Sequence, residues 1–159
     1  MRLNPLTLLV VLTAPSIVFA ADFANLGEAR KVADKAVALF QQEKIVAGYG
    51  SLKSYWPLPG VEIDNLASQT NTQWPMVKGR FGASLSTEFV KECKVGDSVA
   101  RFVYLQKFQN HAIRWMFTFY KPKDKWLVNT VSFDDNIGAL FHADNCLSLI
   151  HISEPTRPY

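Results

Sequence analysis

The sequence predicts one α+β domain in which N-terminal helices pack on one face of a curved, four-stranded antiparallel sheet. Apolar residues recur with the period of a helix up to about residue 77, and with the two-residue period of a strand from residue 84 onward. Short turn segments separate the successive strands, as they do in a meander. Helices followed by a run of strands are typical of domains in which the helices cover one sheet face.

Composition narrows the class of protein. The chain has 159 residues, of which 48% are hydrophobic and 19% charged, so it can bury a core and is not a disordered tail. Its formal net charge is +3, and the basic residues form no run. We therefore expect no nucleic-acid partner.

Three helices are expected in the first half of the chain. The first spans 26–44, with Asn25 as its cap, and its polar face, which includes Arg30 and Asp34, is expected to point away from the core. The second spans 45–56. The third begins at residue 60 and ends at or before Trp74-Pro75, because proline disfavours helix at the residue before it. The apolar face of the first helix comprises Ala29, Val32, Ala33, Ala36, Val37, Leu39 and Phe40.

Four strands are expected in the second half. They cover residues 84–94, 99–108, 111–120 and 126–133, and a short helix over 137–141 follows them. In the first of these strands the alternation predicts that Leu85, Thr87 and Phe89 share one face.

Residues 1–20 have the pattern of a secretory signal peptide. A basic residue precedes a short apolar run that is suited to export and too short to span a bilayer, and small residues follow at Ala20 and Ala21. We expect cleavage near Ala20/Ala21, a periplasmic or secreted location, and no stable membrane span after cleavage.

The other end differs from the rest of the chain. Residues 147–157 resemble, residue for residue, a translated transposase adapter used in sequencing libraries, so 147–159 are interpreted as a non-native tail and 21–146 as the domain. Two cysteines remain, Cys93 and Cys146. In an exported protein they could form a disulfide, but a possible truncation near Cys146 leaves their pairing open.

The sequence contains no pattern for a metal or a cofactor. The histidines and cysteines lack the spacing of a metal site, and there is no G-x-S-x-G nucleophile motif. We therefore expect neither metal nor cofactor. Cys93 is better explained as a small buried strand residue than as a nucleophile.

Acid–base chemistry is the enzymatic option that remains. Asp135 and Glu88 are the weak candidates for a catalytic base, and Tyr104 could donate a hydrogen bond to a developing oxyanion. Simpler roles compete with these. Asp134-Asp135-Asn136 can cap the following helix, and Glu88 can face water or pair with Arg101 or Arg114.

Aromatic residues are dense in the strands. They can form the sheet face that the first helix covers, or they can line a pocket for a small apolar ligand or a patch for an envelope protein. The candidate pocket residues are Phe102, Tyr104, Trp115, Phe117, Phe119 and Trp126.

The aromatic hairpin over 117–126, together with Phe133-Asp134-Asp135-Asn136, resembles small exported bacterial proteins of unassigned function. Their domain is similar to the nuclear transport factor two-like, cystatin-like roll, and the resemblance covers residues 23–141. It implies the α+β roll and no particular activity, because such domains include isomerases, dehydratases, binding domains and assembly adaptors.

Every carboxylate and imidazole thus has a simple structural role, whereas a binding module needs only an apolar cavity or patch. We expect a non-catalytic binding or accessory module of the bacterial envelope. The alternative is a cofactor-free acid–base lyase or isomerase that acts on a small apolar substrate between sheet and helices.

Overall fold

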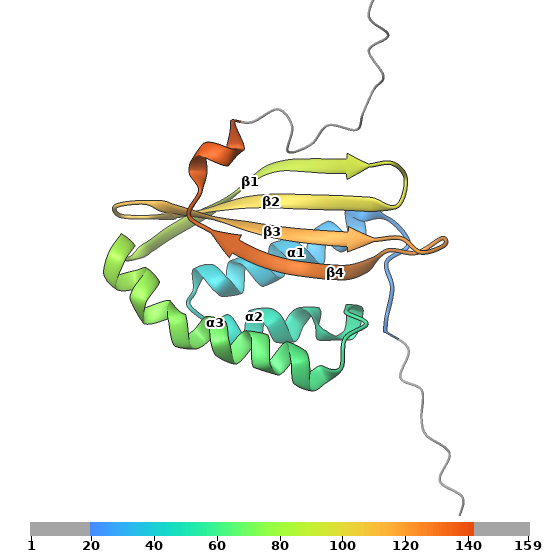
Figure 1. The fold of residues 1–159 in the computed structure, drawn as a ribbon, viewed down its shortest axis with the longest axis horizontal. Helices are drawn as coiled ribbons and strands as arrows, with labels where there is room; N and C mark the ends of the chain where they lie inside the picture. The colour runs from blue at the N-terminus through green and yellow to red at the C-terminus, as the bar shows by residue number, and fades with distance from the viewer. Residues whose placement is uncertain (1–19, 142–159) are drawn as a thin grey trace, which may run out of the picture.

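The computed structural model describes residues 20–141. The first half of this part of the chain forms a layer of helices (Figure 1). The helices are α1 (Leu26–Gln41), α2 (Ile45–Leu52) and α3 (Gly60–Phe81), and the short 3-10 helix η1 (Lys53–Tyr55) directly follows α2. The second predicted helix is therefore shorter than expected and ends in a tighter turn. No helix in this part of the chain is long and apolar enough to cross a membrane.

The sheet follows the helices. Its strands are β1 (Ser84–Val95), β2 (Val99–Phe108), β3 (Ala112–Tyr120) and β4 (Leu127–Asp134), paired antiparallel in the order β1-β2-β3-β4. The 3-10 helix η2 (Ile137–Leu140) comes last and lies on the sheet face opposite to α1, α2 and α3 (Figure 1). The predicted α+β class, with helices on one face of an open antiparallel sheet, is confirmed.

Small side chains let α1 lie close to the sheet. Ala29, Ala33 and Ala36 are fully buried along one stripe of the helix. At the end of this stripe the Phe40 ring stacks on the Trp115 ring, with centroids 4.1 Å apart and planes within 15°. The stacked rings join α1 to the middle of β3, so the apolar period of the helix is matched to the aromatic face of the sheet.

A fully buried amide side chain lies in this core. Gln106 of β2 is 0% exposed, yet both ends of its amide are satisfied. Its Oε1 accepts from Trp115 Nε1 at 2.8 Å, and its Nε2 donates to Ser84 Oγ at 2.8 Å. A buried amide is tolerated when its hydrogen bonds are made, and here it links three strands of the sheet.

α3 continues through Pro75 to Phe81, so the prediction that it ends before this proline is wrong. Pro75 is exposed, and the carbonyl of Asn71 that loses its helical donor belongs to an exposed residue, where water can replace the donor. Trp74 and Phe81, on either side of the proline, are both buried. Their burial holds the helix together across a residue that would otherwise end it.

β1 is less regular than its alternation suggests. Its pairing with β2 shifts between Ser84 and Ser86 and again between Phe89 and Lys91. Each shift adds an unpaired residue and reverses the side-chain alternation. Leu85 is consequently 58% exposed. The prediction that it shares a face with Phe89 is therefore wrong.

Candidate functional site

The structure places all six predicted pocket residues in the hydrophobic core between the sheet and the helices. Neither of the two pockets described within residues 20–141 is lined by any of them. Their side chains pack against one another and against α1, which fills the space that a ligand would need. The six are Phe102, Tyr104, Trp115, Phe117, Phe119 and Trp126, with exposures from 0% to 7%.

Glu88 lies on the sheet face away from the helices. The strand register sets it opposite Leu105, and its carboxylate pairs with Lys107 at 3.2 Å. The expected pairing with Arg101 or Arg114 is wrong, because the diagonal neighbour along β2 is nearer and both arginines bond to residues of other strands. Glu88 is thus an exposed ion-pair residue, and it lines neither of the two pockets described within residues 20–141.

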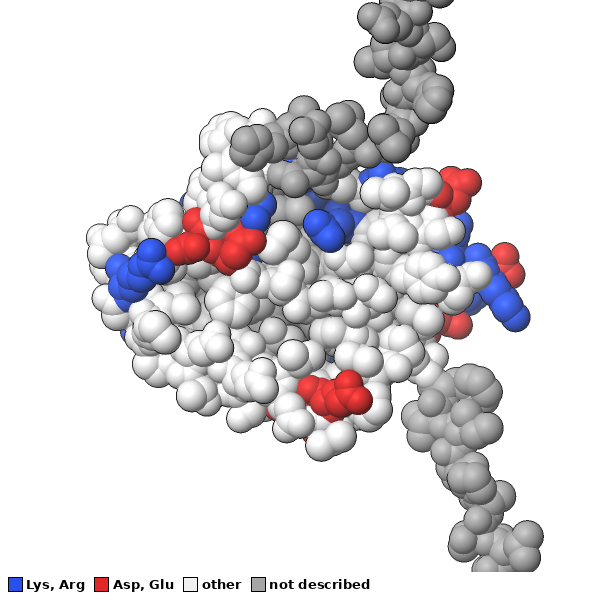
Figure 2. Space-filling model, viewed as in Figure 1, with Lys and Arg blue, Asp and Glu red and all other residues white. Residues whose placement is uncertain are grey.

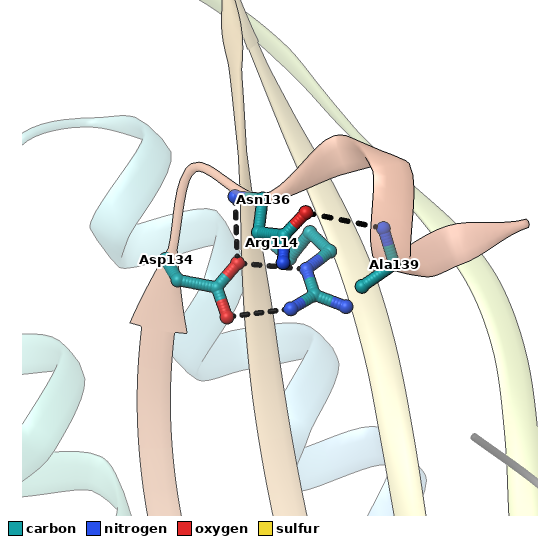
Figure 3. A network of polar contacts seen from close by, with 4 residues as sticks. All are labelled: Arg114, Asp134, Asn136 and Ala139. Carbon is teal, nitrogen blue, oxygen red and sulfur yellow. Dashed lines mark hydrogen bonds and ion pairs between the residues drawn. The ribbon is translucent and has the colours of Figure 1, made fainter. Parts of the chain in front are cut away.

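Asp134 and Asp135 do not cap η2 directly. The guanidinium of Arg114 donates to both oxygens of Asp134, at 2.7 and 2.6 Å, and the Asn136 backbone N–H donates to Asp134 Oδ1 at 2.9 Å (Figure 3). The cap of η2 is Asn136, whose Oδ1 accepts from the Ala139 N–H at 3.2 Å (Figure 3). Asp135 instead pairs with Arg80 at the end of α3, at 3.1 Å.

Tyr104 has a carboxylate partner that the sequence interpretation missed. Its hydroxyl donates to Asp34 Oδ1 at 2.7 Å, and Arg30 Nε donates to the same oxygen at 2.8 Å. The Arg30 guanidinium lies over the Phe89 ring, 3.1 Å from its centroid. The prediction that Arg30 points away from the core is therefore wrong, whereas Asp34 stays 49% exposed at the margin of the core while it accepts from Tyr104. Their i,i+4 spacing beside the buried position Ala33 was the available signal.

Burial raises the pKa of the Tyr104 hydroxyl above its ordinary value, and the hydrogen bond to Asp34 and the charge of Asp34 raise it further. Burial also raises the pKa of Tyr49, whose hydroxyl bonds with Thr70. Tyr104 therefore stays protonated and acts as a hydrogen-bond donor, which ties β2 to α1.

These raised pKa values predict a loss of stability in alkali. An unfolded tyrosine loses its proton near pH 10 while Tyr104 and Tyr49 stay protonated in the folded chain, so the free energy of unfolding should fall above about pH 10. Each tyrosine contributes a slope of up to about 1.4 kcal/mol per pH unit. Urea titrations between pH 8 and 11.5 would measure it. Tyr104→Phe and Tyr49→Phe should each remove that tyrosine's contribution to the slope. An unchanged slope in Tyr104→Phe would contradict the raised pKa of Tyr104.

A surface pocket lies where the end of α3 meets β3 and β4, with a volume of about 190 Å³. Figure 2 shows acidic and basic side chains together at this side of the molecule, next to a broad surface without charge. The apolar part of the pocket comes from all three elements, and a lip carries exposed Met76 and the Arg80–Asp135 pair. The lining residues are Met76, Val77, Arg80, Phe81, Ile113, Phe133, Asp134 and Asp135.

A second pocket, of about 480 Å³, lies beside the β3–β4 hairpin. Its walls are mainly prolines and charged side chains, among them the ion pair of Lys125 with Asp22 at 3.3 Å, and Leu127 is its only large apolar wall residue. Pockets that hold small molecules are mostly apolar with a few polar groups. The pocket at the end of α3, which we call the α3 pocket, has five large apolar side chains in its wall where the second pocket has one, and it is the candidate site.

Several predictions concern residues beyond 20–141. The signal peptide and its cleavage site before Ala21, and the tail over 147–159, fall mainly or wholly outside the described residues. Cys93 is 6% exposed on the sheet face away from the helices. Cys146 lies outside the described part, so the pairing of the two cysteines stays a prediction.

Within residues 20–141, no three His, Cys, Asp or Glu side chains form a group that could hold a metal ion. The α3 pocket likewise offers only carboxylates already paired with arginines. Its chemistry is therefore that of an apolar surface with a neutralised, polar rim. A comparison of the chain with protein families found no matching family, and comparisons with curated proteins and with solved structures found no significant match.

Proposed function

We propose that this protein is an exported, non-catalytic binding module of the bacterial envelope, and that its site is the α3 pocket. The ligand we propose is a small apolar molecule of about one ring. Export is inferred from the signal-like residues 1–20. We also propose that the domain is a nuclear transport factor two-like, cystatin-like roll, which its element order and open antiparallel sheet support.

The observation that carries the proposal is the contrast between a filled interior and an open apolar pocket. Ile113 and Phe81 are almost fully buried, at 1% and 5% exposed, yet both contribute to the pocket surface. Met76 at the lip is 70% exposed, so its side chain is available to contact a ligand in the pocket. A ring-sized molecule in this pocket would remove that apolar surface from water.

The alternative, a cofactor-free lyase or isomerase, has less support. A catalytic base needs an environment that perturbs it and a substrate cavity beside it. Glu88 and Asp135 are each partly exposed and paired with a cation, and the Tyr104 hydroxyl is engaged with Asp34 rather than with either of them. The core around Tyr104 is filled with aromatic rings.

The test is an NMR titration with α-methylstyrene, a neutral hydrocarbon with one ring. Binding should shift the methyl resonances of Met76 and Ile113 in a saturable way. Met76→Ser removes apolar contact at the lip, and we expect it to weaken binding by roughly fivefold, the equivalent of about 1 kcal/mol for one or two buried methylene-sized groups.

Val61→Ser is the matched control. Val61 is also exposed, at 64%, and lies on the same helix but is not part of the pocket. Its substitution should leave the affinity unchanged. No saturable shift at Met76 and Ile113, or an equal loss of affinity in both variants, would reject the α3 pocket as the site.

A further inference from the structure

One buried polar group near the α3 pocket has no hydrogen-bond partner within residues 20–141. Trp74 of α3 is 4% exposed, and among the residues that the structure describes none accepts a hydrogen bond from its indole Nε1. Two other buried tryptophans are satisfied: Trp56 Nε1 donates to the Asn129 carbonyl at 3.1 Å, and Trp115 Nε1 donates to Gln106 at 2.8 Å. A buried N–H without an acceptor costs stability, so Trp74 needs an explanation.

The Phe133 side chain links this indole to the pocket. Phe133 lines the α3 pocket, and its ring lies 6.2 Å from the Trp74 ring in an edge-on contact. On α3, Val77 and Phe81 of the pocket follow Trp74 on the same helix face, three and seven residues later. Phe133 is only partly buried and stands near the end of the edge strand β4, and its ring also contacts the Trp115 ring, with centroids 4.9 Å apart.

We propose that the α3 pocket extends past Phe133 to Trp74, and that the indole N–H donates a hydrogen bond to its ligand. This inference rests on the proposed function and specifies the class of ligand. The ligand is a small apolar molecule that carries a neutral acceptor, such as a carbonyl or ether oxygen, at the end that enters first. A charged acceptor is excluded at that depth, because no cation lies beside the Trp74 ring among its aromatic neighbours to offset the loss of hydration.

A pair of probes with the same shape tests the hydrogen bond. Acetophenone carries a carbonyl oxygen where α-methylstyrene carries a CH₂ group. We expect acetophenone to bind about three- to tenfold more tightly, which is the range for one net hydrogen bond. In ¹⁵N-labelled protein the Trp74 indole proton should move downfield with acetophenone and not with α-methylstyrene. The indole protons of Trp56 and Trp115 should stay in place with both.

Trp74→Phe supplies the control, because it keeps a ring at the position and removes the donor. In this variant both probes should bind with equal affinity. The Met76 methyl reports pocket binding independently of the indole. If that methyl shifts with both probes, while the Trp74 proton stays in place or the affinities are equal in the parent, the hydrogen bond is rejected and the pocket stands. If the methyl shifts with neither probe, both proposals fail.

Discussion

Trp115→Ala is expected to lower the free energy of unfolding by about 3–5 kcal/mol, the range for removing a buried aromatic side chain. Trp115 is 0% exposed and its ring stacks on Phe40 of α1. The substitution removes this stacking contact between α1 and β3. Gln106 is 0% exposed, and the substitution also leaves its Oε1 atom without the Trp115 donor. The total free energy of unfolding of a small domain is about 5–15 kcal/mol, so the variant should be close to unfolding.

Urea denaturation followed by circular dichroism would measure this loss. Trp115→Phe separates the two contributions, because it keeps an aromatic ring but removes the donor to Gln106. We expect it to cost less than the alanine variant, about 1–3 kcal/mol for an unsatisfied buried acceptor plus some lost packing. Thr118→Ala is a control on the same strand, on the opposite sheet face. A loss below about 1 kcal/mol in Trp115→Ala would contradict a filled core and revive a ligand cavity there.

The change of apolar period from helical to alternating was enough to predict the order of elements. β2 and β3 match the expected strands within a residue, because two-residue alternation of aromatic and polar side chains allows only one register against a buried face. The bulges in β1 could not be predicted in this way. They depend on how Leu85 and Val90, the residues left out of the pairing with β2, are accommodated at a sheet edge, which the local pattern does not contain.

The candidate site was harder to predict than the fold. The α3 pocket joins Val77, Ile113 and Phe133, which belong to three elements that are distant in the sequence. A helix that ends at Pro75 would not contain the α3 residues of this pocket, all of which follow the proline. Tyr104 was identified as a candidate donor, but its partner Asp34 was assigned to solvent. Helical periodicity marks the centre of a buried face more sharply than its margins.

Gly48→Ala should destabilise the domain by about 1–3 kcal/mol, although alanine is ordinarily the better helix former. Gly48 is buried in α2, where α1 and α2 approach each other, and a Cβ atom there would overlap the ring carbons Cε1 and Cδ1 of Phe40. That ring cannot move freely, because it stacks on Trp115 and contacts Tyr49 with centroids 5.3 Å apart. The added methyl group would therefore displace either α2 or the centre of the core.

Gly50→Ala is the matched substitution in the same helix, and it should have the opposite sign. Nothing lies within 4 Å of a Cβ atom at Gly50, so the change only reduces the freedom of the unfolded chain and should stabilise by about 0.5–1 kcal/mol. Parallel urea titrations of the parent and the two variants would give both values. If Gly48→Ala were as stabilising as Gly50→Ala, α1 and α2 would have to lie further apart than the burial of Gly48 and Phe40 allows.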